Sequence, residues 1–224
     1  MAVLKIKQST IKTIIFDFDG TLAKLNIDFH RMRDAVGKLI LSYGITRDEL
    51  HTDFVLEMID SAAAILNQRS SHISKKFFDE ANSIIEKIEI EAAENGELFD
   101  RTKELLNSLK SLKISCGIIT RNCAQAVKIV FPDILSYCPV VVCRDAVNKV
   151  KPHPENLNMA LNKLGGSAKH TLMIGDHPLD IKTGRRAGTL TCGVLTGHFQ
   201  INDFIEAGAD LVLPHAADIL NIIK

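Results

Sequence analysis

The stretch that decides the fold of this 224-residue chain is Thr13-Ile14-Ile15-Phe16-Asp17-Phe18-Asp19-Gly20-Thr21. A short apolar run typical of a β-strand ends here in two carboxylates, followed by a glycine and a hydroxyl. Strand alternation places Asp17 and Asp19 on the same side of the backbone. Because neighbouring carboxylates repel each other, this strand end is predicted to bind a divalent cation. The alternative interpretation is an ordinary acidic turn, since Asp-Gly is common in turns.

Composition and charge argue against several classes of protein. The chain carries 27 Lys and Arg against 27 Asp and Glu, so it lacks the positive charge expected of a general nucleic-acid binder. It shows neither a signal-peptide pattern nor an apolar run long enough to cross a bilayer. Five cysteines without a CxxC pair argue against a disulfide framework and a zinc site. We therefore expect a cytoplasmic protein with reduced thiols and no nucleic-acid or membrane partner.

Three consecutive segments after the first motif have the apolar spacing of amphipathic helices. Their apolar stripes run over residues 29–43, 50–65 and 73–88, and the pattern closes at Asn95-Gly96. Such a set is typical of a small helical bundle that buries these stripes in its own core. We expect this bundle, residues 24–95, to be a cap domain inserted into a core formed by residues 1–23 and 96–224.

From Glu97 onward, strands and helices are predicted to alternate. The expected helices span residues 100–112, 123–130, 154–164, 180–187 and 201–207, with a further helix at the end. The expected strands span residues 114–119, 140–143, 171–174, 189–194 and 210–213. Repeating strand–helix units predict a doubly wound, Rossmann-like α/β core with a parallel sheet covered on both faces. Ligands of such sheets bind beyond the carboxyl ends of the strands, and the candidate catalytic and phosphate-binding residues all fall there.

The segment Thr120-Arg121-Asn122, at the end of the second core strand, is a candidate anion-binding site. It offers the Thr120 hydroxyl and the backbone amides of Arg121 and Asn122 at the start of a predicted helix. Free amides and the helix dipole favour an anion such as phosphate at this place. The alternative is an ordinary helix cap, for which Thr and Asn are both typical.

Two further loops at strand ends carry charged side chains. Lys151 lies in a loop stiffened by Pro152 and Pro154, where it is either a phosphate-binding cation or a surface lysine. Asp176 directly follows a predicted strand, and Asp180 lies four residues further on, where a helix is predicted to begin. Both carboxylates suit Mg²⁺, although Asp180 also suits a helix N-terminus. His177, between them, either lines the site or packs locally.

These elements, in this order, resemble the four motifs of the haloacid dehalogenase-like hydrolase superfamily. Asp17 and Asp19 match its first motif, and Thr120 matches its second. The third motif is matched by Lys151, and the fourth by Asp176 with Asp180. The match covers essentially the whole chain, and the helical insertion is similar to the cap of the phosphoglycolate phosphatase branch.

The resemblance implies a Mg²⁺-dependent phosphatase that forms an aspartyl-phosphate intermediate. Asp17 would be the nucleophile, and Asp19 would protonate the leaving alcohol and later accept a proton from water. Mg²⁺ would be held by the carboxylates of Asp17 and Asp176 and by the backbone carbonyl of Asp19. Asp180 would lie close by or act through a water molecule. An acid at the position of Asp19 favours phosphoryl transfer over dehalogenation, because a halide leaves without a proton.

The implied substrate is a small phosphate ester, such as a phosphoglycolate-like molecule or a sugar phosphate. Thr120, Arg121, Asn122 and Lys151 form the expected phosphate-binding set. Two alternatives to a phosphatase remain: a phosphomutase, which passes the phosphoryl group to a sugar, and an inactive binding or regulatory protein. We expect a monomer or a homodimer.

Specificity is expected to lie in the cap. The candidate residues, which follow the first motif, are Lys24, Asn26, His30 and Arg31. Arg31 suits a substrate carboxylate, as phosphoglycolate would require. The alternative is an exposed polar first turn of a helix.

Overall fold

The protein divides into two compact units. The computed structural model describes residues 4–50 and 52–223, and the units comprise Met1–Leu25 with Gly96–Lys224, and Asn26–Asn95. The second unit begins two residues later than predicted. The reason is that β4 (Ala23–Lys24) pairs with β5 (Glu97–Leu98) and so belongs to the first unit. Residues 1–3 and 224 of the predicted core lie outside the described residues.

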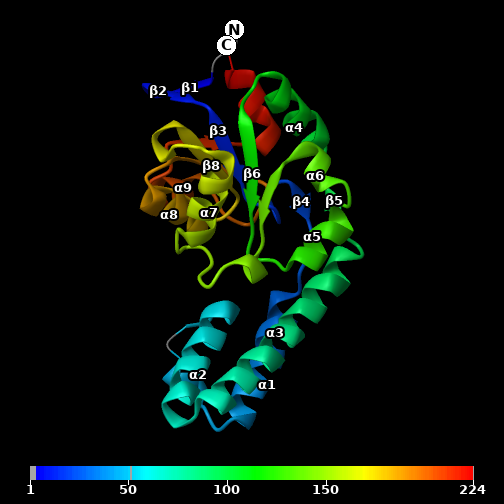
Figure 1. The fold of residues 1–224 in the computed structure, drawn as a ribbon, viewed down its shortest axis with the longest axis vertical. Coiled ribbons are helices and arrows are strands. Elements are labelled where there is room, and N and C mark those ends of the chain that lie inside the picture. Colours follow the sequence, from blue (N-terminus) through cyan, green and yellow to red (C-terminus); the bar gives the residue numbers. More distant parts are fainter. Residues whose placement is uncertain (1–3, 51, 224) are drawn as a thin grey trace. The chain divides into compact units, whose positions relative to one another are not determined.

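A six-stranded sheet forms the centre of the first unit (Figure 1). In spatial order its strands are β10 (Leu211–Leu213), β9 (Leu190–Val194), β8 (Thr171–Gly175), β3 (Thr13–Phe16), β6 (Ser115–Ile119) and β7 (Val140–Val142). All pairings in this sheet are parallel. The central strands β3 and β8 are buried at every position, as expected when helices cover both faces. The predicted doubly wound α/β fold is confirmed.

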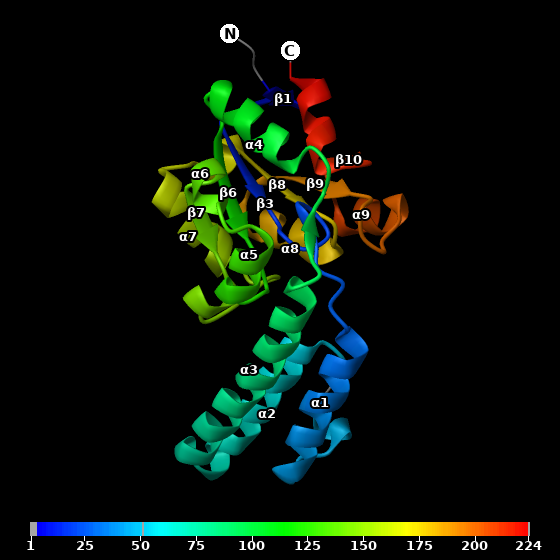
Figure 2. The ribbon, with the colours of Figure 1, turned by 90° about the vertical axis from the view of Figure 1, so that its right-hand side faces the viewer.

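Helices cover the two faces of the sheet (Figures 1 and 2). One face carries α7 (Glu155–Leu164), α8 (Pro178–Ala187) and α9 (Ile201–Ala207). The other face carries α4 (Thr102–Ser111), α5 (Ala124–Val130) and α6 (Ile134–Tyr137). The chain passes from β3 to β6 and β7 on one side, and then returns to β8 on the other side of β3. The ends of β3 and β8 therefore flank the point where the strand order reverses, which is where such folds bind ligands.

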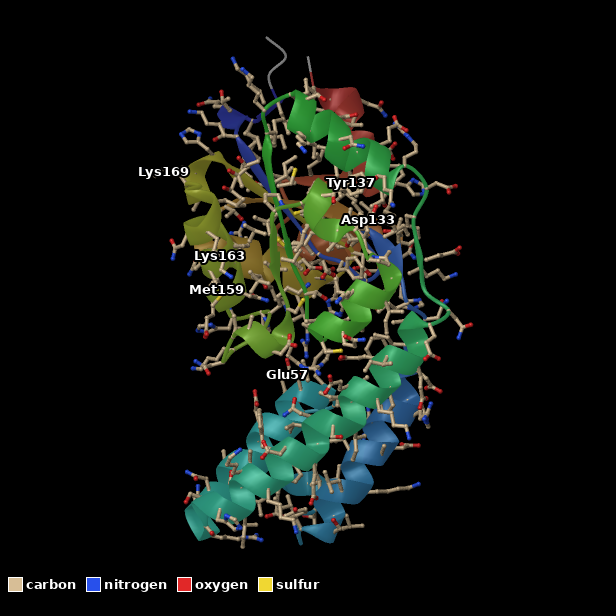
Figure 3. All side chains as sticks on the ribbon, turned by 45° about the vertical axis from the view of Figure 1, so that its right-hand side comes forward. Glu57, Asp133, Tyr137, Met159, Lys163 and Lys169 are labelled. Atoms are coloured by element: carbon tan, nitrogen blue, oxygen red, sulfur yellow. The ribbon has the colours of Figure 1, made fainter. Side chains whose placement is uncertain are left out.

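Apolar packing fixes these strand ends. Ile15 of β3, Met173 of β8 and Leu157 of α7 belong to one buried cluster. Figure 3 shows Met159 and Lys163 on α7: Met159 is partly buried against this cluster, whereas Lys163 is exposed. The loops that follow β3 and β8 thus start from a rigid base.

Some short elements differ from the sequence-based expectation. An N-terminal hairpin, β1 (Leu4–Ile6) and β2 (Ser9–Ile11), has strands of three residues, which are too short to show an alternating pattern. The last segment is not an α-helix but the 3-10 helix η4 (Ala216–Ile222). All five cysteines are free and buried. Among the described residues, no helix is long and apolar enough to cross a membrane.

The described residues of the second unit form the three α-helices that the apolar stripes predict. They are α1 (Phe29–Ser42), α2 (Val55–Arg69) and α3 (Ser71–Ala93), with the short η1 (Arg47–Glu49) after α1. Phe77 of α3 is fully buried and meets Tyr43 in an edge-on contact at 5.3 Å. Such an aromatic contact stabilises the bundle beyond simple area burial.

Candidate functional site

The turn after β3 places the first two carboxylates. The backbone N–H of Asp17 donates to the carbonyl of Ile174 at 2.8 Å, which ties the end of β3 to β8. The chain then turns at Gly20, whose φ of +81° lies in the left-handed region that favours glycine. The N–H of Gly20 donates to the carbonyl of Ala23 at 2.7 Å. Asp17 is therefore held in a tight, hydrogen-bonded turn.

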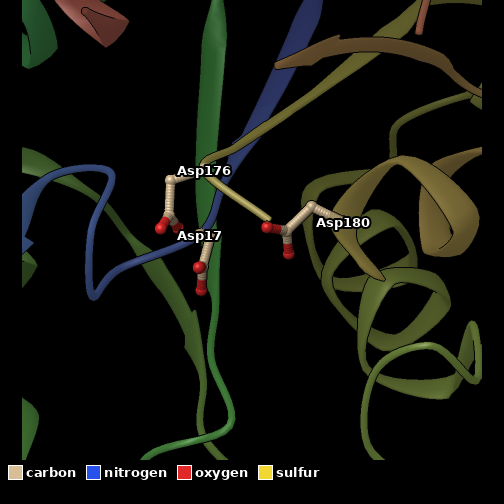
Figure 4. A group of neighbouring side chains, drawn as sticks. All are labelled: Asp17, Asp176 and Asp180. Carbon is tan, nitrogen blue, oxygen red and sulfur yellow. The ribbon is translucent and has the colours of Figure 1, made fainter. Parts of the chain in front are cut away.

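Three carboxylates converge at the ends of β3 and β8 (Figure 4). One oxygen from each of Asp17, Asp176 and Asp180 lies within 4.8 Å of the others. Burial and the charges of Asp17 and Asp180 raise the pKa of Asp176 from 3.8 to about 9. Burial also raises the pKa of Asp17 to about 6, although Lys151 opposes this shift. The cluster thus carries more negative charge than its surroundings stabilise.

Lys151 is the cation at the centre of this cluster. Its side chain is almost completely buried, and Nζ lies 2.6 Å from Asp17 Oδ1 and 2.6 Å from Asp180 Oδ1. Burial by itself would lower the pKa of Lys151, but Asp17 and Asp180 outweigh burial and raise it. Lys151 is therefore a charged ammonium inside the site and not the surface lysine of the alternative interpretation.

Asp176 is enclosed by Gly20 and Thr21 of the first motif and by a loop that no motif predicts, which carries Thr196 and Gly197. A Cβ on Gly20 or on Gly197 would lie 2.3 Å or 2.2 Å from Asp176 Oδ2, far inside van der Waals contact. The Thr21 hydroxyl donates to Asp176 Oδ1 at 3.3 Å. Thr196, at the end of β9, donates to the carbonyl of Gly20 at 2.5 Å. Their position in the sequence is the one signal that could have indicated these two residues, since Thr196 and Gly197 follow a strand at the same edge of the sheet as Asp17 and Asp176.

The donor set of this cluster fits a hard divalent cation. All three side chains offer oxygen, which Mg²⁺ and Ca²⁺ prefer. One ammonium faces three carboxylates, and Asp176 becomes an anion at neutral pH only if additional positive charge offsets its burial. The Asp19 carboxylate is not part of this group: its Oδ1 accepts the N–H of Leu25 at 2.9 Å. Burial raises the pKa of Asp19 to about 6, so Asp19 can exchange a proton near neutral pH.

The Thr120 segment follows β6, the neighbour of β3. Thr120 and Asn122 are both buried. The backbone N–H of Asn122 donates to Thr120 Oγ1 at 3.1 Å, and α5 begins later, at Ala124, with Cys123 as its cap. The expectation that the Asn122 amide lies free at a helix start is therefore wrong. Its side-chain Nδ2, by contrast, is buried without a hydrogen-bond partner among the residues that the structure describes, and such a donor is costly unless a ligand accepts from it.

Two arginines brace this segment. Arg121 donates from a guanidinium nitrogen to the carbonyl of Lys151 at 3.1 Å. Arg144 donates in turn to the carbonyl of Arg121 at 3.2 Å, and Asp145 accepts the N–H of Ala124 at 3.2 Å. These bonds link the loops after β6 and β7 to the loop that carries Lys151. Arg121 therefore helps to position Lys151.

His177 adopts a fixed orientation at the start of α8. Its ring nitrogen Nδ1 accepts the backbone N–H of Leu179 at 3.0 Å, while the backbone N–H of His177 donates to Asp180 Oδ2 at 3.1 Å. Its ring meets Phe199 edge-on at 4.3 Å. Burial and the charge of Lys151 lower the pKa of His177 to about 4. His177 is therefore a neutral histidine at neutral pH.

The predicted specificity residues lie on either side of the boundary between the units. Lys24 is exposed on β4, and Asn26 has a φ of +57°. His30 pairs with Asp34 at 3.3 Å, and Arg31 pairs with Glu91 at 2.6 Å. The charge of Arg31 is thus compensated within the helical unit, which weakens the expectation that it pairs with a substrate carboxylate.

The fold and the site together define a class of enzyme. Its doubly wound core brings a lysine and several aspartates together at one edge of the sheet, and a helical unit is inserted between β4 and β5. Residues 14–194 match the model of the haloacid dehalogenase-like hydrolase family. The chain belongs to this family, and the predicted resemblance is confirmed.

Curated relatives align over almost the whole chain. The pyrophosphatase PpaX of Oceanobacillus iheyensis is 28% identical over 218 residues, which cover 96% of this chain and 97% of the relative. The N-acetylmuramic acid 6-phosphate phosphatase of Pseudomonas aeruginosa is 27% identical over 226 residues, with 97% of both chains covered. These names support the predicted class of enzyme, a phosphatase.

Solved structures share the fold. A hydrolase from Pseudomonas syringae aligns with a TM-score of 0.68 at 23% identity, covering 94% of this chain and 96% of its own. A haloacid dehalogenase-like family protein from Streptococcus pneumoniae aligns with a TM-score of 0.64 at 19% identity, covering 94% and 97%.

Proposed function

We propose that this protein is a Mg²⁺-dependent phosphatase that hydrolyses a small phosphorylated metabolite through an aspartyl-phosphate intermediate. The observation that carries the proposal is the buried group formed by Lys151 and the carboxylates of Asp17, Asp176 and Asp180. An ordinary structural ion pair does not need three carboxylates within 4.8 Å of one another. Three converging oxygen ligands are what a divalent cation binds.

In the proposed reaction, a carboxylate oxygen of Asp17 attacks phosphorus, and the bond between phosphorus and the leaving oxygen breaks. Asp19 donates a proton to that leaving oxygen. A water molecule then attacks the aspartyl-phosphate, returns its proton to Asp19 and releases inorganic phosphate with Asp17 restored. A pKa of about 6 for both residues suits these roles, since Asp17 is mainly ionised and Asp19 exchanges protons at neutral pH.

The remaining residues would hold the cation and the phosphoryl oxygens. The carboxylates of Asp17 and Asp176 and the carbonyl of Asp19 would bind Mg²⁺, with Asp180 close by or acting through water. Bound Mg²⁺ would shield the charge of Asp17 from the phosphate and stabilise charge on the phosphoryl oxygens. Lys151, the Thr120 hydroxyl and Asn122 Nδ2 would donate to those oxygens, and Arg121 would support Lys151.

The test is phosphate release from 4-nitrophenyl phosphate with Mg²⁺ or with EDTA. We expect activity with Mg²⁺ that falls by about a thousandfold in Asp17→Asn, because an amide is a poor nucleophile. Asp28→Asn is the matched control, since Asp28 caps α1 through a side-chain oxygen that Asn retains. Equal activity of Asp17→Asn and the parent would refute the nucleophile assignment.

A panel of phosphorylated metabolites distinguishes the remaining alternatives. It should contain inorganic pyrophosphate and sugar phosphates, the substrate types named by the curated relatives. Free phosphate without an isomerised sugar phosphate identifies a phosphatase, whereas an isomer identifies a phosphomutase. The absence of any turnover would favour an inactive binding protein.

We further propose that the helical cap contributes to specificity through Lys24, Asn26, His30 and Arg31, to be tested by KM values of alanine variants. The five buried free thiols suit the reducing cytoplasm. The proposed partner is a small phosphate ester. We also propose that the protein is a monomer or a homodimer, and light scattering distinguishes these two states.

A further inference from the structure

His177 stands beside the proposed reaction centre in a loop that its neighbours fix. It separates Asp176 from α8 and forms both halves of a capping box with that helix. The backbone N–H of Leu179 donates to the ring nitrogen Nδ1 of His177 at 3.0 Å, and the backbone N–H of His177 donates to Asp180 Oδ2 at 3.1 Å. The ring therefore has a defined position and not a free rotation.

This hydrogen bond also determines where the ring carries its proton. A neutral imidazole has one donor nitrogen and one acceptor nitrogen. Because Nδ1 accepts from Leu179, the proton lies on Nε2. No group among residues 4–50 and 52–223 accepts a hydrogen bond from Nε2, and the side chain is only half-buried. His177 thus presents an available N–H donor.

The ring follows one of the proposed metal-binding carboxylates directly in the chain and packs against one aromatic side chain. His177 directly follows Asp176, and its backbone N–H is bonded to Asp180 Oδ2, which places it next to two of the converging carboxylates. Phe199, from the loop after β9, contacts the ring at 4.3 Å with 61° between the planes. A neutral donor next to an aromatic ring suits an organic group with hydroxyls better than a doubly charged phosphoryl group, which calls for cations.

We propose that His177 is a specificity-determining residue, whose Nε2–H donates to a hydroxyl oxygen of the leaving group and thereby selects phosphate esters of sugars or polyols. This inference rests on the proposed phosphatase function and names its substrate class. It favours hydroxylated carbon skeletons over inorganic pyrophosphate, whose leaving group has no carbon skeleton to lie against Phe199.

The test compares kcat/KM within two matched substrate pairs: glycerol 3-phosphate with propyl phosphate, and glucose 6-phosphate with cyclohexylmethyl phosphate. All four have primary alcohols as leaving groups, so the members of a pair differ mainly in hydroxyls. We expect the parent protein to prefer the hydroxylated member of at least one pair. We expect His177→Asn to reduce that preference about tenfold, mainly through KM, as the loss of one hydrogen bond predicts.

Two variants separate substrate recognition from helix capping. Asn keeps a short side-chain oxygen for the N–H of Leu179 but lacks the distal donor. Gln carries an amide donor further out and is a poorer cap. Recognition predicts that His177→Asn loses selectivity and His177→Gln regains part of it, although His177→Gln has the lower melting temperature. A purely structural role predicts that selectivity follows the melting temperature.

Three results would overturn the inference while leaving the proposed function intact. They are a parent protein without preference in either pair, an unchanged ratio in His177→Asn, and a higher kcat/KM for pyrophosphate than for all four esters. Failure of the parent protein to hydrolyse any phosphate ester would instead refute the proposed function itself.

Discussion

The substitution Asp176→Asn should stabilise the metal-free protein while it removes metal binding. Asn has nearly the same shape as Asp, so it fits between Gly20 and Gly197, and its Oδ1 can still accept from Thr21. The substitution removes one of the three converging carboxylates. The stability gained then measures the repulsion and desolvation that a bound cation offsets in the parent protein.

The size and sign of this effect follow from the pKa of Asp176. Burial raises that pKa from 3.8 in the unfolded chain to about 9 in the folded protein. Between these values the folded state binds the proton more tightly, so the stability of the metal-free protein falls as pH rises from about 4 to about 9. This linkage costs the parent about 4 kcal/mol at pH 7 and about 2 kcal/mol at pH 5. Asp176→Asn should therefore be more stable than the parent by these amounts.

The measurement is urea unfolding, followed by circular dichroism in EDTA at pH 5, 7 and 8. Adding MgCl₂ at pH 7 should stabilise the parent and leave the variant unchanged, because a ligand stabilises only the state that binds it. A stability difference that stays constant or shrinks between pH 5 and pH 8 would refute the reasoning.

Asp210→Asn is a control with the opposite sign. Burial alone would raise the pKa of Asp210, but hydrogen bonds from Lys7 and from the N–H of Thr191 outweigh burial and lower it. A carboxylate with a lowered pKa stabilises the fold above its unfolded-state pKa, and that stability is lost as pH falls. Asp210→Asn should thus be less stable than the parent at pH 7, and its deficit should shrink at low pH.

Three further substitutions test separate parts of the site. Lys151→Met leaves Asp17 and Asp180 without the ammonium that lies 2.6 Å from each. We expect urea unfolding without metal to show a free energy of unfolding lower by about 3–5 kcal/mol, and Mg²⁺ to restore part of it. Unchanged stability would contradict a buried charge pair. Gly197→Ala places a methyl 2.2 Å from Asp176 Oδ2 and should weaken Mg²⁺ binding in calorimetry at least about tenfold, whereas the control Gly37→Ala, in α1 with no atom within 4 Å of the added Cβ, should bind Mg²⁺ like the parent. Asp19→Ala should slow hydrolysis of an alkyl phosphate about a hundredfold or more but slow 4-nitrophenyl phosphate much less, because nitrophenolate leaves without a proton; equal losses would argue against Asp19 as the general acid.

The sequence predicts the architecture well because its signals are local. The apolar run before Asp17 and the helical stripes of residues 29–88 identify strands and helices from spacing alone. The hairpin of β1 and β2 and the 3-10 form of η4 escape prediction, because their elements are too short for a period to appear.

The site is predictable only where it follows a motif. Asp17 and Asp176 directly follow strands, and Lys151 lies in the loop between β7 and α7, so the topology brings them to one edge of the sheet. Gly197 lies against Asp176, and Thr196 donates to the carbonyl of Gly20; their place after a strand at the same edge of the sheet does not by itself single them out. The Asn122 amide is misjudged for a related reason: whether Thr120 accepts from it depends on the backbone path, not on residue type.

The short ladder between β4 and β5 has a consequence for how this family diversifies. Ala23 pairs with Leu98 and Lys24 with Glu97. The two strands that connect the core to residues 26–95 are therefore hydrogen-bonded neighbours. For a flexible insertion of that length, closing the loop would cost about 2.5 kcal/mol more than closing a four-residue turn. The ladder and an independently folded insert avoid most of that difference. Evolution can therefore lengthen, shorten or exchange the inserted segment at this junction, while the catalytic sheet keeps its sequence and its chemistry.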